Sequence, residues 1–164
     1  MTVKEFAVRR LVKEQRVCYM KIGSRYYINY PRSMEFDTNN HSVFMLNYHL
    51  IMCVKYRNNV IDDAISLRLK EIFKNICLNY NISLEEWNHD KDHVHVLFRG
   101  QPNSEISKFI NAYKSASSRL IKKEYPEIKK HLWKDMFWSQ SYCLISTGGV
   151  TVDIIKEYIQ TQGR

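Results

Sequence analysis

Glycine and proline are scarce in this chain, with 5 and 3 among 164 residues, and no run of about 18 apolar residues occurs. The scarcity excludes collagen-like and low-complexity disordered chains. The four cysteines lie far apart without a C-x-x-C pair, which argues against both a zinc ribbon and a disulfide framework. Lys4, Glu5, Arg9 and Arg10 occupy the place where a signal peptide needs its apolar core. We therefore expect a cytoplasmic protein with no membrane partner.

Apolar residues make up 45% of the chain, aromatic residues 13% and charged residues 26%, which is the composition of a globular domain with a sizeable core. A length of 164 residues fits one domain, or one domain with a small appendage. The formal net charge of +8 favours a polyanionic partner, either nucleic acid or an anionic membrane surface.

Half of the excess charge lies in the first quarter of the chain, because residues 1–40 contain 8 basic and 4 acidic side chains. A polar break at residues 37–40 predicts a boundary between a basic N-terminal extension, 1–38, and a main domain, 40–164. Residues 18–28 predict two short strands around a Gly-Ser turn. This stretch resembles the recognition-helix and wing portion of excisionase-like winged helix-turn-helix domains, which makes Arg25 a candidate DNA contact. The alternative is an extension that packs on the main domain.

The main domain alternates between strand and helix periodicity. Residues 44–56 and 92–99 alternate apolar and other side chains with period 2, as half-buried strands do, whereas 62–80 and 104–125 have the spacing of amphipathic helices. Further strands are predicted near 83–87 and over 137–146, and a terminal helix over 152–162. The order β-α-β-β-α-β-α predicts an α+β fold, a ferredoxin-like or RRM-like antiparallel sheet with helices on one face.

Two histidines alternate on the predicted strand 92–99. His93 and His95 are separated by one residue, so both imidazoles point to the same face, while Val94 faces the helices. Two neutral imidazoles placed in this way can bind one divalent metal ion. Two histidines are too few ligands for a closed zinc site. The alternative to a metal site is that both are ordinary surface residues.

The terminal helix contains Tyr158 and Gln162, which lie four residues apart and therefore share one helix face. A tyrosine on such a helix, taken alone, is usually half-buried packing. His-x-His on an internal strand followed about 60 residues later by Tyr-x-x-x-Gln resembles the HUH single-tyrosine transposases of small insertion sequences, the TnpA type that moves single-stranded DNA. The resemblance covers residues 40–162. It includes 48–51, 55–57, 114–119 and 137–139 in family order.

The resemblance implies an enzyme, a metal-dependent single-stranded DNA transposase. Mg²⁺ or Mn²⁺ would be held by His93, His95 and Gln162, and Tyr158 would attack the phosphodiester to give a 5′-phosphotyrosine intermediate. Such enzymes act on DNA hairpins near the ends of their element. The resemblance also implies a homodimer with composite active sites, in which the C-terminal helix carries the nucleophile.

Positive side chains on the second helix are a solvated face in most proteins, but with a nucleic-acid substrate they become candidate phosphate contacts. The candidates are Lys108, Lys114, Arg119 and Lys122. His49 could either support a metal ligand or be a plain core histidine, and we favour the structural role. Asp92 is predicted to point away from both histidines and not to be a ligand.

Two alternative functions stay open, and a third is excluded. One is a domesticated relative that uses the same chemistry on repeat hairpins, and another is a non-catalytic RRM-like binder of single strands. The third, a His-x-His-x-His nucleotide hydrolase, fails because Leu97 occupies the position of the third histidine.

Overall fold

The computed structural model describes residues 19–22, 25–28, 37–38, 42–147, 156 and 159–160. The chain divides into two compact units, Met1–Glu35 and Phe36–Arg164. In the first unit, β1 (Tyr19–Ile22) pairs antiparallel with β2 (Arg25–Ile28), as the sequence predicted. The other residues of this unit lie outside the described ranges, and the winged-helix resemblance stays a prediction.

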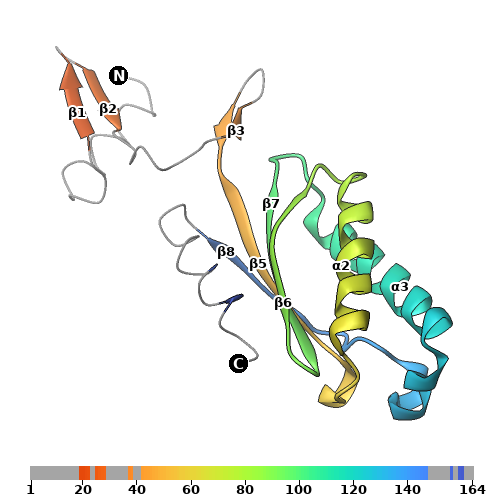
Figure 1. Cartoon of the computed structure of the whole chain (residues 1–164). Helices are drawn as coiled ribbons and strands as arrows, with labels where there is room; N and C mark the ends of the chain where they lie inside the picture. Colours follow the sequence, from red (N-terminus) through yellow and green to blue (C-terminus); the bar gives the residue numbers. More distant parts are fainter. Residues whose placement is uncertain are drawn as a thin grey trace. The chain divides into compact units, whose positions relative to one another are not determined.

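The second unit contains a four-stranded antiparallel sheet in the order β6-β7-β5-β8 (Figure 1). The strands are β5 (Leu46–Cys53), β6 (Ser83–His89), β7 (His93–Gly100) and β8 (Cys143–Thr147). Between them come α2 (Asp63–Cys77) and α3 (Ile106–Glu124), which cover one face of the sheet (Figure 1). The predicted ferredoxin-like α+β fold is confirmed.

The second unit begins with a small hairpin in which β3 (Asp37–Thr38) pairs antiparallel with β4 (Val43–Phe44). The sequence predicted a linker at Asp37 and Thr38, but Arg99 Nη1 on β7 lies 3.3 Å from Asp37 Oδ1. Asp37 and Thr38 therefore belong to the second unit, because they pair with Val43–Phe44 and Asp37 forms this ion pair.

The core lies between the sheet and the two helices. Leu50 and Met52 of β5 alternate with side chains of the other face, as do Val94, Val96 and Phe98 of β7, and all five are at most 1% exposed. Helix residues of period 3.6 complete this layer: Leu69, Ile72, Phe73, Phe109, Ile110, Tyr113 and Ile121. Each fully buried side chain of this size contributes about 1.5–3 kcal/mol to folding.

Helix α2 begins where the sequence places a cap, because the Asp62 carboxylate accepts a hydrogen bond from the Ile65 amide at 2.8 Å. Strand β6 contains an irregularity between Leu84 and Glu86, which leaves Glu85 outside the regular register. The sequence did not predict this bulge.

The predicted strands 44–56 and 137–146 are both too long. The first ends at Cys53, after which Tyr56 takes a left-handed conformation (φ 57°) in a 3₁₀ turn, η1 (Lys55–Arg57). In the second, residues 137–139 make only a bridge between Trp138 and Val54 before β8 begins at Cys143. Two further 3₁₀ turns, η2 (Pro126–His131) and η3 (Trp133–Asp135), connect α3 to this bridge.

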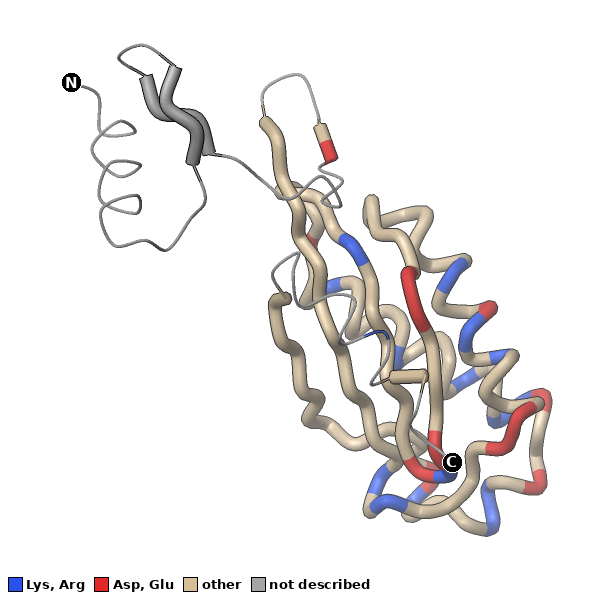
Figure 2. The backbone as a smooth tube through the Cα atoms, turned by 60° about the vertical axis from the view of Figure 1, so that its left-hand side comes forward, with Lys and Arg blue, Asp and Glu red and all other residues tan. Residues whose placement is uncertain are grey.

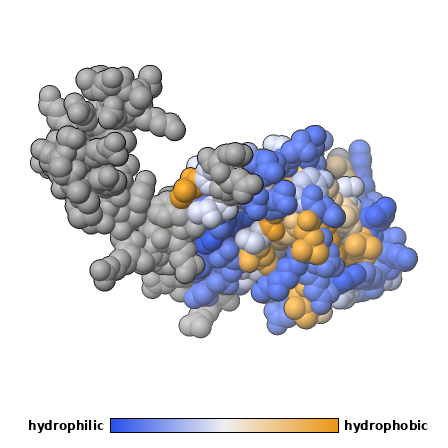
Figure 3. Space-filling model, turned by 90° about the horizontal axis from the view of Figure 1, so that it is seen from above, coloured by the Kyte–Doolittle hydropathy of each residue, from blue (hydrophilic) through white to orange (hydrophobic). Residues whose placement is uncertain are grey.

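Charged residues are concentrated on the helices and at the end of the sheet where β5 ends, while β5 and β8 contain none (Figure 2). The face shown in Figure 3 is mainly hydrophilic, with apolar side chains in small patches. None of the described helices is long and apolar enough to cross a membrane.

Both buried tryptophans of this unit donate their indole N–H to a helix serine. Trp87 Nε1 lies 3.1 Å from Ser66 Oγ, and Trp138 Nε1 lies 2.9 Å from Ser117 Oγ. Ser117 is fully buried and its hydroxyl also lies 2.6 Å from the Tyr113 carbonyl. These serines therefore satisfy indole groups that would otherwise be buried without a partner.

We predict that Ser117→Ala lowers the free energy of unfolding by about 1–3 kcal/mol, because the Trp138 indole loses its acceptor in a dry environment. Urea denaturation measures the change. Ser115→Ala, at an exposed position of the same helix, is the control and should stay within about 0.5 kcal/mol of the parent. Equal stabilities for the two variants would contradict the role given to this hydrogen bond.

Candidate active site

His93 and His95 lie side by side on β7, as their spacing predicted. Their ring centroids are 4.9 Å apart, with the planes inclined by 70°. His95 is 3% exposed, and burial, reinforced by the neighbouring His93 and His49, lowers its pKa to about 4. At neutral pH the His95 ring is therefore uncharged, which is the form that coordinates a metal ion.

His49 belongs to the same cluster rather than to the apolar core. It lies on β5, on the face that carries His95, and its Nε2 is 3.1 Å from His95 Nδ1. The rings stack with centroids 5.3 Å apart. Because this contact engages Nδ1 of His95 and fixes the plane of its ring, His49 holds the orientation of the His95 Nε2 atom.

Asp92 contacts His93, which corrects the prediction that it points away from the histidines. Its Oδ1 lies 2.5 Å from His93 Nδ1, and its Oδ2 accepts a hydrogen bond from Arg57 Nε at 2.5 Å. Asp92 precedes the first residue of β7, so strand alternation does not govern its side chain. Burial would raise the pKa of Asp92, but the hydrogen bonds from Arg57 and His93 lower it below its ordinary value.

A second arrangement of possible ligands lies at the same end of β7. Among the described residues, Asp90, Asp92 and His93 each offer an atom within 4.8 Å of the others. Arg57 and the ring of His93 already engage Asp92, and Asp90 is exposed. His93 belongs to both possible ligand sets. A metal ion held by the histidine pair would use His95 and not Asp90, whereas one held by the acidic group would use Asp90 and not His95.

Part of the histidine face of the sheet is covered by residues near the C-terminus. Asn88 lies opposite His95 in the β6–β7 register, and its side-chain amide donates to the carbonyl of Ile159. Ile159 is fully buried, as is Leu97 on the same face of β7. Lys156, Ile159 and Gln160 are the described residues of what we call the terminal segment. Ile159 thus lies against β6, on the side opposite α2 and α3.

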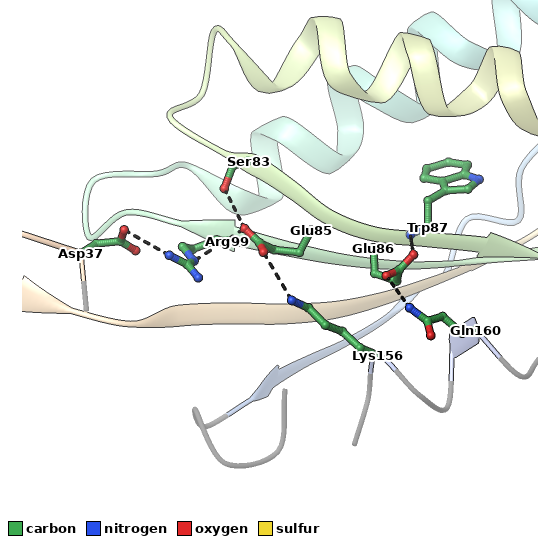
Figure 4. A network of polar contacts seen from close by, with 8 residues as sticks. All are labelled: Asp37, Ser83, Glu85, Glu86, Trp87, Arg99, Lys156 and Gln160. Carbon is green, nitrogen blue, oxygen red and sulfur yellow. Dashed lines mark hydrogen bonds and ion pairs between the residues drawn. The ribbon is translucent and has the colours of Figure 1, made fainter. Parts of the chain in front are cut away.

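Two further polar contacts attach this segment to β6 (Figure 4). Gln160 Nε2 lies 3.1 Å from Glu86 Oε2, and Lys156 Nζ lies 3.8 Å from Glu85 Oε2. Glu85 also lies 3.7 Å from Arg99 Nε, which links the terminal segment to the ion pair of β3 and β7 (Figure 4). The bulge in β6 brings both glutamates toward the terminal segment.

The predicted nucleophile Tyr158 and the predicted ligand Gln162 lie outside the described residues. Their described neighbours Ile159 and Gln160 are helical and contact β6 on the histidine face. The assignment of Tyr158 and Gln162 stays a prediction.

Three of the predicted DNA contacts line one hollow of about 810 Å³ between α3 and residues 135–140. They are Lys114, Arg119 and Lys122, and Lys123 and Lys129 also line it. Lys108 is not among its lining residues and pairs with Glu105 at 2.5 Å. Arg25 is the first residue of β2 in the N-terminal unit, and its role in DNA binding stays a prediction.

Comparison with known proteins identifies the family that shares this arrangement. The profile of IS200-like transposases matches residues 42–162, a stretch that includes the sheet, both helices and the terminal segment. The chain belongs to the IS200-like transposase family. It is thus a transposase of the HUH single-tyrosine class, as the sequence resemblance implied.

Two relatives of this transposase show how far the similarity extends. It is 36% identical over 120 residues to the ISDra2 transposase TnpA of Deinococcus radiodurans, which covers 73% of this chain and 86% of the relative. It is 25% identical over 122 residues to the transposase of insertion sequence element IS200 from Salmonella typhimurium, covering 74% and 80%.

Solved structures agree with the fold. A crystal structure of a Deinococcus radiodurans transposase superimposes with a TM-score of 0.63 at 32% identity, covering 77% of this chain and 97% of the other. A REP-associated tyrosine transposase bound to a REP hairpin gives a TM-score of 0.55 at 9% identity, covering 74% and 70%, which shows likeness of fold.

Sequence reasoning missed Arg57 and Asn88 as parts of the site. Arg57 was noted only as part of a Lys-Tyr-Arg run, and nothing in its local pattern indicates a carboxylate partner 35 residues later. Asn88 could have been found from register, since it shares a face with Glu86 on the strand that pairs with β7.

We predict that Asn88→Ala loosens the terminal segment without unfolding the sheet. Loss of one hydrogen bond to the Ile159 carbonyl should lower the local opening free energy by about 0.5–1.5 kcal/mol. Amide hydrogen exchange would then accelerate at residues 159–160 and stay unchanged in β5 and β7. Asn103→Ala, at an exposed position of the turn before α3, is the control, and unchanged exchange at 159–160 in Asn88→Ala would contradict the contact.

Proposed function

We propose that this transposase cleaves and rejoins single-stranded DNA by a metal-dependent reaction in which Tyr158 is the nucleophile and a 5′-phosphotyrosine link is the intermediate. The observation that carries the proposal is the neutral His95 beside an oriented His93, on the face of the sheet over which the terminal segment packs. The two histidines, the terminal residues that lie over them and the membership of the family all support an active site on this face of the sheet.

The histidine pair fits a divalent cation. Asp92 engages Nδ1 of His93 and His49 engages Nδ1 of His95, so each ring keeps Nε2 as its coordinating atom. Mg²⁺ or Mn²⁺ bound by these residues and Gln162 would supply Lewis-acid polarisation of the scissile phosphate. The chain's own contribution is the fixed orientation of the two rings and the exclusion of water by Leu97 and Ile159.

The tyrosine step conserves the energy of the phosphodiester bond. The Tyr158 phenol, with an ordinary pKa of about 10, gives up its proton as its oxygen bonds to phosphorus. The bond to the 3′ oxygen breaks, and that oxygen leaves as a 3′-hydroxyl after taking up a proton. A later 3′-hydroxyl attack on the phosphotyrosine reverses these steps, so strands are rejoined without a nucleotide cofactor.

The basic hollow beside α3 suits the DNA backbone. Its lining contains Lys114, Arg119, Lys122, Lys123 and Lys129 but a single acidic residue, Asp135. Burial lowers the pKa of Lys114, whose ammonium donates to the Gln140 carbonyl at 2.7 Å. We assign phosphate contacts to this hollow, and the hairpin bound by the REP-associated relative supports a hairpin substrate here.

A homodimer with composite active sites is part of the proposal. Within the described part of the chain, strand β8 pairs with β5 on one side only, and its Ile145 is 49% exposed. An edge strand of this kind offers unpaired backbone groups to a second copy. The alternative of a domesticated relative uses the same chemistry and differs only in its DNA substrate, which would be a repeat hairpin.

We predict that His95→Ala weakens Mn²⁺ binding by more than the roughly 10- to 100-fold that loss of an outer-sphere partner costs. Calorimetric titration of the full chain measures this affinity. Asp92→Asn should fall within that 10- to 100-fold range, and Asp90→Asn should bind as the parent does. The reverse order, with Asp90→Asn weak and His95→Ala unchanged, would assign the metal to the acidic group instead.

We predict that Tyr158→Phe abolishes covalent attachment to DNA. The parent chain, Mn²⁺ and a labelled single-stranded hairpin from the ends of its element should yield labelled protein on a denaturing gel. Removal of the phenolic oxygen or chelation of the metal should remove the label while hairpin binding persists, since phosphate contacts supply most of the affinity.

Attachment that survives in Tyr158→Phe would disprove the assignment of the nucleophile. Tight binding by the parent with no adduct in either metal would favour the RRM-like binder.

A further inference from the structure

An exposed aromatic pair lies beside the candidate active site, where η1 meets η3. Tyr56 is 63% exposed and Trp133 40% exposed, and their rings meet edge to face with centroids 5.1 Å apart. The other tryptophans of the chain, Trp87 and Trp138, are at most 8% exposed. We call Tyr56 and Trp133 the aromatic platform.

The platform is held in place by backbone hydrogen bonds from the end of the sheet. The Lys55 amide donates to the Phe137 carbonyl at 2.8 Å, and the Ser139 amide donates to the Cys53 carbonyl at 2.9 Å. The Asn58 side chain donates to the His131 carbonyl at 2.7 Å. Both turns are therefore fixed before any ligand binds, so little ordering is needed on binding.

Left-handed backbone conformations present both rings to solvent. Tyr56 and Arg57 have φ values of 57° and 56°, and Lys134 and Asp135 have φ values of 46° and 60°. Such values are uncommon for residues other than glycine and are often retained for function. Neither turn buries a residue of its own that would account for this conformation.

Positive charge surrounds the platform. Lys55 Nζ lies 4.8 Å from the Tyr56 ring centroid and Lys134 Nζ lies 4.6 Å from that of Trp133. The nearby carboxylates are already paired, Asp92 with Arg57 and Asp135 with Lys122. Among the described residues, Lys55 and Lys134 have no carboxylate partner. An anionic ligand with flat rings matches this combination of aromatic faces and ammonium groups.

Two connections place the platform between the two regions that we assign to DNA. Arg57 follows Tyr56 directly and reaches His93 through Asp92, with 2.5 Å at each contact. Asp135 follows Lys134 and lines the basic hollow. A strand that runs from the hollow to the histidines would therefore pass the platform.

We propose that Tyr56 and Trp133 form a stacking site for an unpaired nucleobase of single-stranded DNA, with Lys55 and Lys134 contacting the adjoining phosphates. The proposal rests on the proposed function for the path of the strand, and it adds a site that reads single-stranded character next to the cleaved phosphate. Bases inside a duplex are already stacked on their neighbours, so the site favours an unpaired strand beside a hairpin.

The test is a fluorescence titration of the full chain carrying Tyr158→Phe, which prevents cleavage, with oligothymidylate of eight nucleotides. Trp133 is the exposed indole, so stacking should quench its emission. Tyr56→Asn keeps a residue that tolerates left-handed backbone and should weaken binding roughly 5- to 100-fold. Leu78→Asn, at the 81% exposed C-cap of α2, is the matched control and should leave binding unchanged.

Two probes separate bases from phosphates. An abasic octamer of equal charge should bind without quenching emission, while Trp133→Phe should retain affinity for oligothymidylate and lose the quench. Equal affinity for the abasic and thymidine octamers, or no effect of Tyr56→Asn on either, would overturn the proposal. So would a change in oligomeric state caused by Tyr56→Asn without a change in DNA affinity.

The outcome is independent of the tyrosine chemistry. Quenching in the Tyr158→Phe background together with absence of an adduct in the parent would retain the stacking site and reject the proposed reaction. An adduct without quenching would do the opposite.

Discussion

The antiparallel pairing of β5 with β7 is the interaction on which the rest of the molecule depends. These two central strands are flanked by β8 and β6, so their backbone groups are paired on both sides and their side chains alternate between two buried faces. One face supplies the apolar layer under α2 and α3, and the other carries His49, His93 and His95. A slip of β7 by one residue would reverse its two faces and place the imidazoles of His93 and His95 in the apolar core. The register that stabilises the fold therefore also assembles the site.

Most of the fold follows from periodicity, because period 2 and period 3.6 report directly which side chains face the core. The alternation through Leu50, Met52, Val94 and Val96 predicted both central strands, and the pairing of His93 with His95 followed from the same rule. Periodicity fails where a chain leaves regular structure: at Tyr56 the apolar pattern continues although the backbone turns.

The parts of the site that the sequence could not predict depend on contacts between distant segments. Asp92 reaches His93 because it stands just before the strand, where alternation no longer applies, and its second partner Arg57 comes from η1. The covering of the histidine face depends on the Ile159 carbonyl meeting Asn88 across 71 residues. No local pattern contains such information, whereas the family resemblance placed Tyr158 near the histidines without any contact being known.

The proposed metal-binding histidines are held firmly. His93 and His95 belong to a central strand, and moving them would disrupt the paired sheet and its core. The described residues of the terminal segment contact β6 through the Asn88 hydrogen bond to the Ile159 carbonyl, a hydrogen bond from Gln160 to Glu86 and a surface ion pair from Lys156 to Glu85, which contributes about 0–1 kcal/mol. A reaction that must hold a covalently linked strand and later exchange it for another benefits from this arrangement, because a strand that is paired on both sides keeps the proposed metal ligands in place.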